Sequence, residues 1–128
     1  MGSPIEVSAY VPPPRDMCQI EVYPVEITPT DRLTIRQQIY RGKIVNFAIM
    51  QDVLESGTWH QVARIDCCHG TIHRHQYNRD GIDLYDHRVI QEIPATRGWA
   101  VVDAGYVSAQ DAMFNEYEEN LRRWRDGA

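Results

Sequence analysis

The sequence predicts an α+β domain: an antiparallel sheet, a meander of about five strands, with one C-terminal helix packed on one face. Two observations predict it. From residue 17 to about residue 93, short stretches of alternating apolar and polar residues are separated by turn residues, as in consecutive antiparallel strands. After residue 108 the apolar positions recur at steps of three and four residues, which is the period of a helix with one apolar stripe.

The composition is that of one globular domain. Of the 128 residues, 43% are hydrophobic and 24% are charged, as in ordinary soluble proteins. No apolar run approaches the ~20 residues of a membrane span, and the N-terminus lacks the basic start and apolar core of a secretory signal. Three cysteines, two of them adjacent, form no disulfide framework. We therefore expect a cytoplasmic protein with no membrane contact.

The formal net charge of −5 argues against a broad basic surface for nucleic acid, although not against a small cationic patch. Residues 1–16 contain four prolines. This composition predicts a flexible Pro-rich arm, followed by a single α+β domain over residues 17–128.

The strands are expected in order along the domain. Residues 17–27 alternate, and Pro24 marks an edge or an end. Residues 33–39 also alternate, although Thr30 and Gly42 would suit the two ends of a short helix there. Further strands, each bounded by turn residues, are predicted at residues 44–54, 59–68, 72–77 and 82–93.

The C-terminal helix is expected to begin near Ser108, because Ser108 and Asp111 have the spacing of a capping box, with Asp in place of the usual Glu. Its apolar stripe consists of Ala109, Met113, Tyr117, Leu121 and Trp124. The stripe needs an apolar partner, which the sheet supplies. The other sheet face is then left open, and we expect the function there.

Residues 66–75 hold three of the five histidines and two of the three cysteines. Gly70 followed by Thr71 predicts a type II′ turn, which pairs Cys68 with His73 and Asp66 with His75. Because faces alternate along strands, one set of polar side chains shares the open face. This set is Arg64, Asp66, Cys68, His73, His75 and Tyr77.

The residues of this face are compatible with several functions. A solvated, hydrogen-bonded surface would carry the same residues. Asp66, Cys68, His73 and His75 could also supply tetrahedral metal ligands, but Cys67 diverges from Cys68 on a strand, and neither CxxC nor HExxH is present. We therefore expect no metal and no other cofactor. A catalytic Cys68 beside His73 is a weaker alternative, because nothing signals an oxyanion hole.

Acid–base chemistry suits these residue types best. Cleaving RNA without a metal needs a base, an acid and a cation for the phosphorane charge. His73 and His75 titrate near neutrality and could transfer the protons. The planar guanidinium group of Arg64 matches the geometry of a phosphate group, and Asp66 could orient one imidazole.

The pattern Arg64-x-Asp66-x-x-His69-Gly70-x-x-His73-Arg74-His75, with Asn120-x-x-x-Trp124 near the C-terminus, resembles small prokaryotic proteins similar to TumE-like toxin components of toxin–antitoxin pairs. The resemblance covers roughly residues 44–125. It implies a toxin-like protein acting on RNA, as a ribonuclease or an inhibitor of translation, that a cognate antitoxin neutralises. The Pro-rich N-terminal region, the adjacent cysteines and the acidic charge depart from the pattern.

The catalytic residues of such a ribonuclease would be His73, His75, Asp66 and Arg64, and its substrate-binding residues Arg74, Tyr77 and His69. The alternative is a non-enzymatic binding or structural protein that uses the open face for a protein partner or for a homo-oligomer, or a His/Cys/Asp metal-binding protein.

Overall fold

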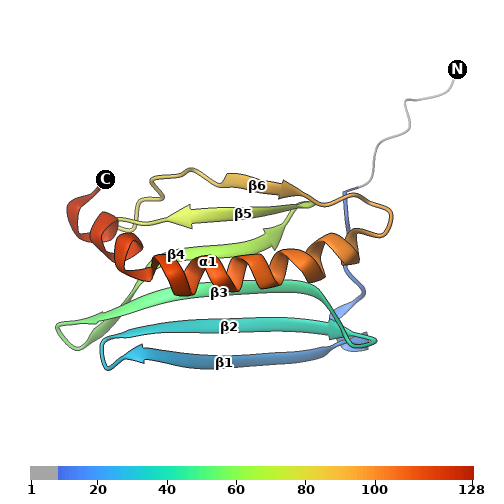
Figure 1. The fold of residues 1–128 in the computed structure, drawn as a ribbon, viewed down its shortest axis with the longest axis horizontal. Helices are drawn as coiled ribbons and strands as arrows, with labels where there is room; N and C mark the ends of the chain where they lie inside the picture. The colour runs from blue at the N-terminus through green and yellow to red at the C-terminus, as the bar shows by residue number, and fades with distance from the viewer. Residues whose placement is uncertain (1–8) are drawn as a thin grey trace, which may run out of the picture.

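The computed structural model describes residues 9–128. It has six antiparallel strands in chain order and one long helix, shown in Figure 1. The strands are β1 (Gln19–Thr28), β2 (Asp31–Tyr40), β3 (Lys43–Glu55), β4 (Thr58–Cys68), β5 (Thr71–Gln76) and β6 (Arg88–Glu92). A short 3₁₀ turn, η1 (Arg15–Met17), precedes β1, and α1 (Gly98–Asp126) follows β6. The predicted α+β meander with a C-terminal helix is confirmed, with six strands in place of about five.

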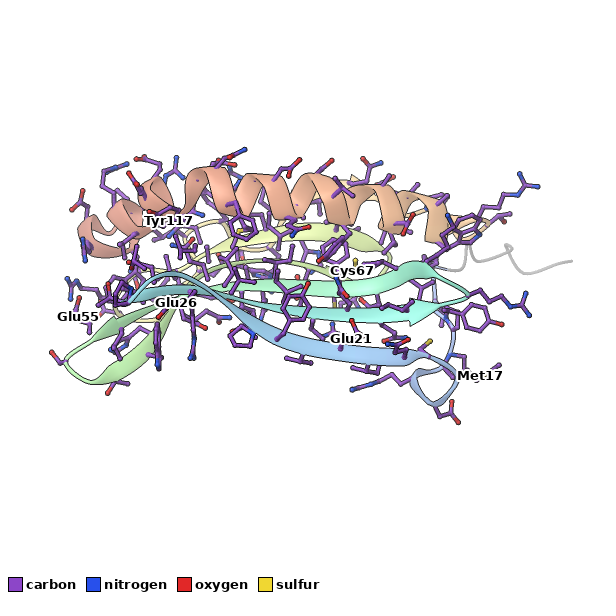
Figure 2. All side chains as sticks on the ribbon, turned by 60° about the horizontal axis from the view of Figure 1, so that its bottom comes forward. Met17, Glu21, Glu26, Glu55, Cys67 and Tyr117 are labelled. Atoms are coloured by element: carbon purple, nitrogen blue, oxygen red, sulfur yellow. The ribbon has the colours of Figure 1, made fainter. Side chains whose placement is uncertain are left out.

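The sheet and the helix form two layers. α1 lies along one face of the sheet, and within residues 9–128 no helix covers the opposite face (Figures 1 and 2). The core fills the space between the layers. Its largest fully buried side chains include Leu33, Ile35, Phe47, Ile49, Ile65 and Met113. No helix within residues 9–128 is long and apolar enough to cross a membrane.

Two strand expectations are settled by pairing. Residues 31–40 form β2 and not a helix, because the strand is hydrogen-bonded to neighbours on both sides. Pro24 lies opposite Thr34 in β1, an edge strand, and edge strands are where sheets tolerate proline. The strand predicted over residues 82–93 is wrong in extent: only Arg88–Glu92 form β6, and a loop precedes it.

The helix begins at Gly98, well before the predicted start at Ser108. The residue before it, Arg97, is left-handed and makes no side-chain cap, so the usual capping signature is missing. Val102 and Tyr106 extend the buried stripe toward the N-terminus. Packing on the sheet, and not a cap, therefore sets where this helix starts.

The β4–β5 turn differs from the predicted type II′ turn. Its central residues are His69 and Gly70, with φ of 50° and 76°, which is the signature of type I′. The register therefore pairs Asp66 with His73 and Arg64 with His75. The pairing shifts by two residues relative to the prediction, so every side chain keeps its predicted face.

Gly70→Val is expected to destabilise the domain by about 1 kcal/mol or more, because valine resists a positive φ. A Cβ at this position would also lie 3.0 Å from the Cβ of Ala9. The matched control is Gly57→Val, which has φ of 77° and nothing within 4 Å of its Cβ position. Thermal unfolding followed by circular dichroism should show the larger loss at Gly70. Equal losses would mean that the contact with Ala9 contributes nothing.

The Pro-rich arm is predicted to be flexible over residues 1–16, of which residues 1–8 lie outside the described residues. The remainder contacts the domain. The Tyr10 hydroxyl donates a hydrogen bond to the Val45 carbonyl at 2.8 Å, and the Gln38 amide donates one to the Pro13 carbonyl at 2.9 Å. These contacts bring residues 9–14 to the end of the sheet where α1 begins.

Candidate functional site

The open face carries a group of titratable side chains from β4, β5 and the loop before β6. Along β5, Arg74 and Gln76 contact the helix residue Asn120. Because faces alternate, His73 and His75 point to the opposite face. They meet three further side chains there. We call Asp66, His73, His75, Asp83 and His87 the histidine cluster.

Three donor atoms of the cluster converge on one point. His75 Nε2 lies 3.3 Å from Asp66 Oδ1, and His73 Nε2 lies 3.6 Å from the same oxygen. Each of the three side chains offers one donor atom, and these atoms lie within 4.8 Å of one another. We call Asp66, His73 and His75 the donor triad. Two imidazole nitrogens and one carboxylate oxygen form a compact ligand set of the kind that transition metals use.

The other ring nitrogen of each imidazole already has a hydrogen-bond partner. His73 Nδ1 lies 2.7 Å from Thr71 Oγ1. The Thr71 hydroxyl donates its only hydrogen to the Cys68 carbonyl at 3.1 Å, so it accepts a hydrogen bond from His73 Nδ1–H. His75 Nδ1 lies 2.8 Å from Asp83 Oδ2. The hydrogen bonds at Nδ1 therefore orient both rings so that Nε2 points toward Asp66.

Asp83 organises the loop that completes the cluster. Its carboxylate accepts backbone N–H groups from Gln76, Tyr85 and His87 at 3.0–3.2 Å. Burial alone would raise the pKa of Asp83, but hydrogen bonds from His75 and from these N–H groups lower it overall. Asp83 is therefore ionised at neutral pH and can hold His75 Nδ1–H.

The surroundings of His73 favour its neutral form. Burial lowers its pKa, and the nearby His75, His87 and Arg64 act in the same direction, while Asp66 opposes them. A neutral His73 that donates through Nδ1 presents a lone pair at Nε2. That lone pair faces Asp66 Oδ1 at 3.6 Å, so the two groups repel each other unless a cation lies between them.

Arg64 and Tyr77 lie beside the cluster as their shared face predicts. Arg64 Nε lies 3.2 Å from Asp66 Oδ2, in an ion pair without hydrogen-bond geometry, since this nitrogen has no hydrogen-bond partner within residues 9–128. The Tyr77 ring is parallel to the His75 ring, with 6.0 Å between centroids. Both residues can therefore help to hold or shield the donor triad.

Other predicted site residues are dispersed. Arg74 faces α1, where it pairs with Glu116 at 3.4 Å and with Asn120 at 2.9 Å, so it is remote from the open face. Cys67 points into the layer between sheet and helix (Figure 2), and burial raises the pKa of its thiol to about 12. The exposed Cys68 and His69 lie at the rim of the pocket described next.

A shallow pocket of about 440 Å³ opens over the cluster. It gives the donor triad access to solvent and to a ligand. Its lining consists of Arg64, Asp66, Cys68, His69, Thr71, His73, His75, His87 and Val89.

Asp83 and His87 were not identified from the sequence. His87 has its ring centroid 4.9 Å from that of His75. The strand predicted over residues 82–93 includes both residues, whereas Asp86 and His87 have positive φ and bend the loop over the open face. The presence of further Asp and His residues just after β5 was the available signal.

Comparison with known proteins adds the family. No curated protein and no solved structure matches the chain. Residues 16–123 match a family model described as a domain of unknown function (DUF7718), a range that includes α1 to Arg123 and the whole histidine cluster. The chain therefore belongs to the DUF7718 family.

Proposed function

We propose that the donor triad holds one divalent metal ion of the zinc class, and that this centre hydrolyses phosphodiester bonds in RNA. The observation that carries the proposal is the convergence of His73 Nε2, His75 Nε2 and Asp66 Oδ1 within 4.8 Å. Metal-binding histidines usually donate their second ring N–H to a carboxylate or another acceptor. Asp83 and Thr71 stand in those positions for His75 and His73.

The metal centre replaces the acid–base pair that the sequence favoured. Proton transfer requires each imidazole to reach the substrate. His73 and His75 are only 6% and 2% exposed, and both Nε2 atoms point at Asp66. A metal ion needs only the three donor atoms and an open side for water. We therefore favour metal binding over the expected absence of a cofactor, and His73 and His75 become ligands.

A zinc-class ion would supply a hydroxide nucleophile and polarise a phosphoryl oxygen at neutral pH. The chain's own residues would do the rest. Asp83 and Thr71 hold the imidazole rings in place, and Asp66 contributes the negative charge. Arg64, at the wall of the same pocket, would bind a phosphate oxygen with its planar fork.

The choice of RNA as substrate rests on the resemblance of residues 64–75 to TumE-like toxins and on Arg64 beside the donor triad. On this proposal the protein is toxin-like, and an antitoxin partner would cover or distort the pocket. Inducible expression with and without a candidate antitoxin tests this role through growth. Cells that grow normally with the wild-type protein alone would contradict it.

The metal proposal has a direct test through Asp83. Asp83→Asn keeps the ligands but weakens the acceptor that holds His75, so zinc affinity should fall by about 10–100-fold. Titration calorimetry on the metal-stripped protein measures this. The matched control is Asp80→Asn, an exposed residue of the same loop, which should leave affinity unchanged. Wild-type protein without about one zinc per chain, or cleavage that persists in a chelator, would overturn the proposal.

A further inference from the structure

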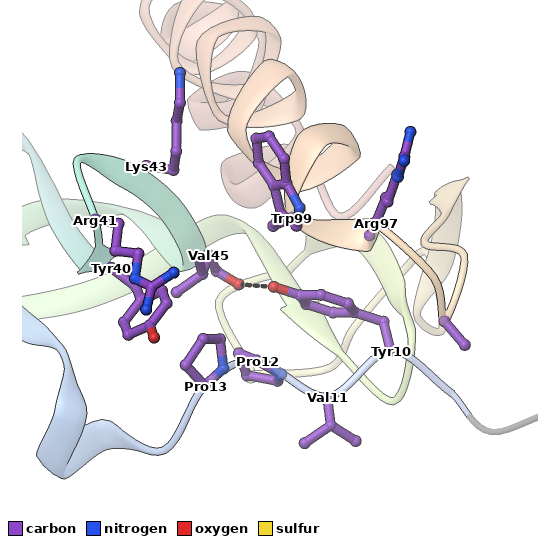
Figure 3. Close-up of a pocket in the computed structure, with 12 residues that line it drawn as sticks. Tyr10, Val11, Pro12, Pro13, Tyr40, Arg41, Lys43, Val45, Arg97 and Trp99 are labelled. Carbon is purple, nitrogen blue, oxygen red and sulfur yellow. Dashed lines mark hydrogen bonds between the residues drawn. The ribbon is translucent and has the colours of Figure 1, made fainter.

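A second pocket lies at the end of the sheet, where three segments meet. They are residues 10–13 of the N-terminal arm, the β2–β3 turn and the start of α1 (Figure 3). The pocket has a volume of about 570 Å³. Its polar and aromatic lining consists of Tyr10, Tyr40, Arg41, Lys43, Arg97 and Trp99. We call it the aromatic–cationic groove.

The groove is positive in an acidic protein. Among residues 9–128, Arg41, Lys43 and Arg97 line it and no acidic residue does, although the chain carries a net charge of −5. Within residues 9–128 none of these three cations forms a salt bridge. Three unpaired cations around one hollow raise the local concentration of an anionic ligand.

Aromatic rings lie among these cations. Trp99 is 42% exposed at the first turn of α1. Tyr10 is held by its hydroxyl bond to the Val45 carbonyl, and the Arg41 guanidinium lies 5.1 Å from the centre of the Tyr40 ring. Tyr10 and Tyr40 are half-buried. Aromatic rings interspersed with cations are a means by which proteins bind single-stranded nucleic acid, because bases stack while phosphates pair.

The groove is connected to the histidine cluster along the surface. A shallow hollow beside the β4–β5 turn shares Ala95 with the groove. The same hollow shares His69 and Thr71 with the pocket over the donor triad. The three hollows therefore adjoin one another around the end of the sheet, and Glu92 is the acidic residue that lines the connecting one.

We propose that the aromatic–cationic groove binds the single-stranded RNA segment that flanks the bond cleaved at the histidine cluster. This inference rests on the proposed function for the choice of RNA. Unpaired bases are required because a base within a duplex cannot stack on Trp99 or Tyr10. The phosphates between these bases would face Arg41, Lys43 and Arg97.

The test is fluorescence anisotropy of a labelled, unstructured RNA of about 12 nucleotides, a length within the range of single-strand sites. Trp99→Ala should weaken binding by about 5–150-fold, the effect of losing one stacked base. Arg41→Glu with Lys43→Glu should weaken binding and flatten its dependence on salt, by about 0.7 in logarithmic slope per lost phosphate contact. Circular dichroism confirms that each variant is folded.

Matched controls come from the same helix. Phe114→Ala removes an exposed aromatic ring, and Arg125→Glu reverses an exposed cation at the far end. Both should bind RNA as the wild type does. Wild-type affinity in the groove variants, or tighter binding of a duplex of the same sequence, would overturn the proposal that the groove binds single-stranded RNA.

Running the same samples on a gel separates the two proposals. In one outcome, the groove variants lose affinity for RNA while the wild type binds RNA without cleaving it and without zinc. That result would support RNA binding in the groove and contradict the proposed metal centre. If zinc binds and RNA is cleaved equally well by wild type and groove variants, the metal centre stands and the groove fails.

Discussion

His73→Ala is expected to lower zinc affinity by more than about 100-fold and to remove RNA cleavage with it. Loss of a residue that merely orients a ligand typically costs 10–100-fold, and His73 contributes a donor atom itself. Only two ligands, His75 and Asp66, would remain, which are too few protein ligands for a tetrahedral centre. Metal analysis after dialysis, together with titration calorimetry, measures the change.

His60→Ala is the control for this variant. His60 lies at the other end of β4, next to Trp124, and is not a member of the donor triad. It should bind zinc as the wild type does. Unchanged zinc binding in His73→Ala, in a protein whose circular dichroism is native, would exclude the donor triad as the metal site.

Met113→Asp is expected to unfold the domain or cause it to aggregate. Met113 is 0% exposed in the interface of α1 with the sheet. The substitution loses the ~1.5–3 kcal/mol gained by burying the side chain and places an unpaired carboxylate in an apolar site. A domain of this size has a total stability of only about 5–15 kcal/mol. Thermal denaturation should therefore show no cooperative transition.

The same substitution one residue along the helix provides the comparison. Phe114 is 36% exposed, so Phe114→Asp should fold and melt within a few degrees of the wild type. A native melting curve for Met113→Asp would mean that α1 is not held by this stripe.

The sequence by itself determined which side chains share a face. Alternation along a strand depends only on whether two residues are separated by an even or an odd number of positions. Arg64, Asp66, His73 and His75 therefore reached one face even though the turn was predicted at Gly70 and Thr71 and lies at His69 and Gly70. The change from alternating to helical spacing likewise predicted α1 on the opposite face.

Helix and strand boundaries depended on contacts between distant segments. The start of α1 at Gly98 carries no capping residue, and the apolar positions Val102 and Tyr106 are set by packing on the sheet. Local propensity is too weak to place such a boundary, because most helix stability comes from tertiary packing.

Only the tertiary structure decided the chemistry of the open face. The loop before β6 brings Asp83 to His75 Nδ1, and the type I′ turn places Asp66 directly opposite His73. Together these contacts turn both Nε2 atoms toward one carboxylate oxygen. Residue types and spacing cannot reveal this convergence, because the orientation of an imidazole ring depends on hydrogen-bond partners that only the folded chain brings within reach.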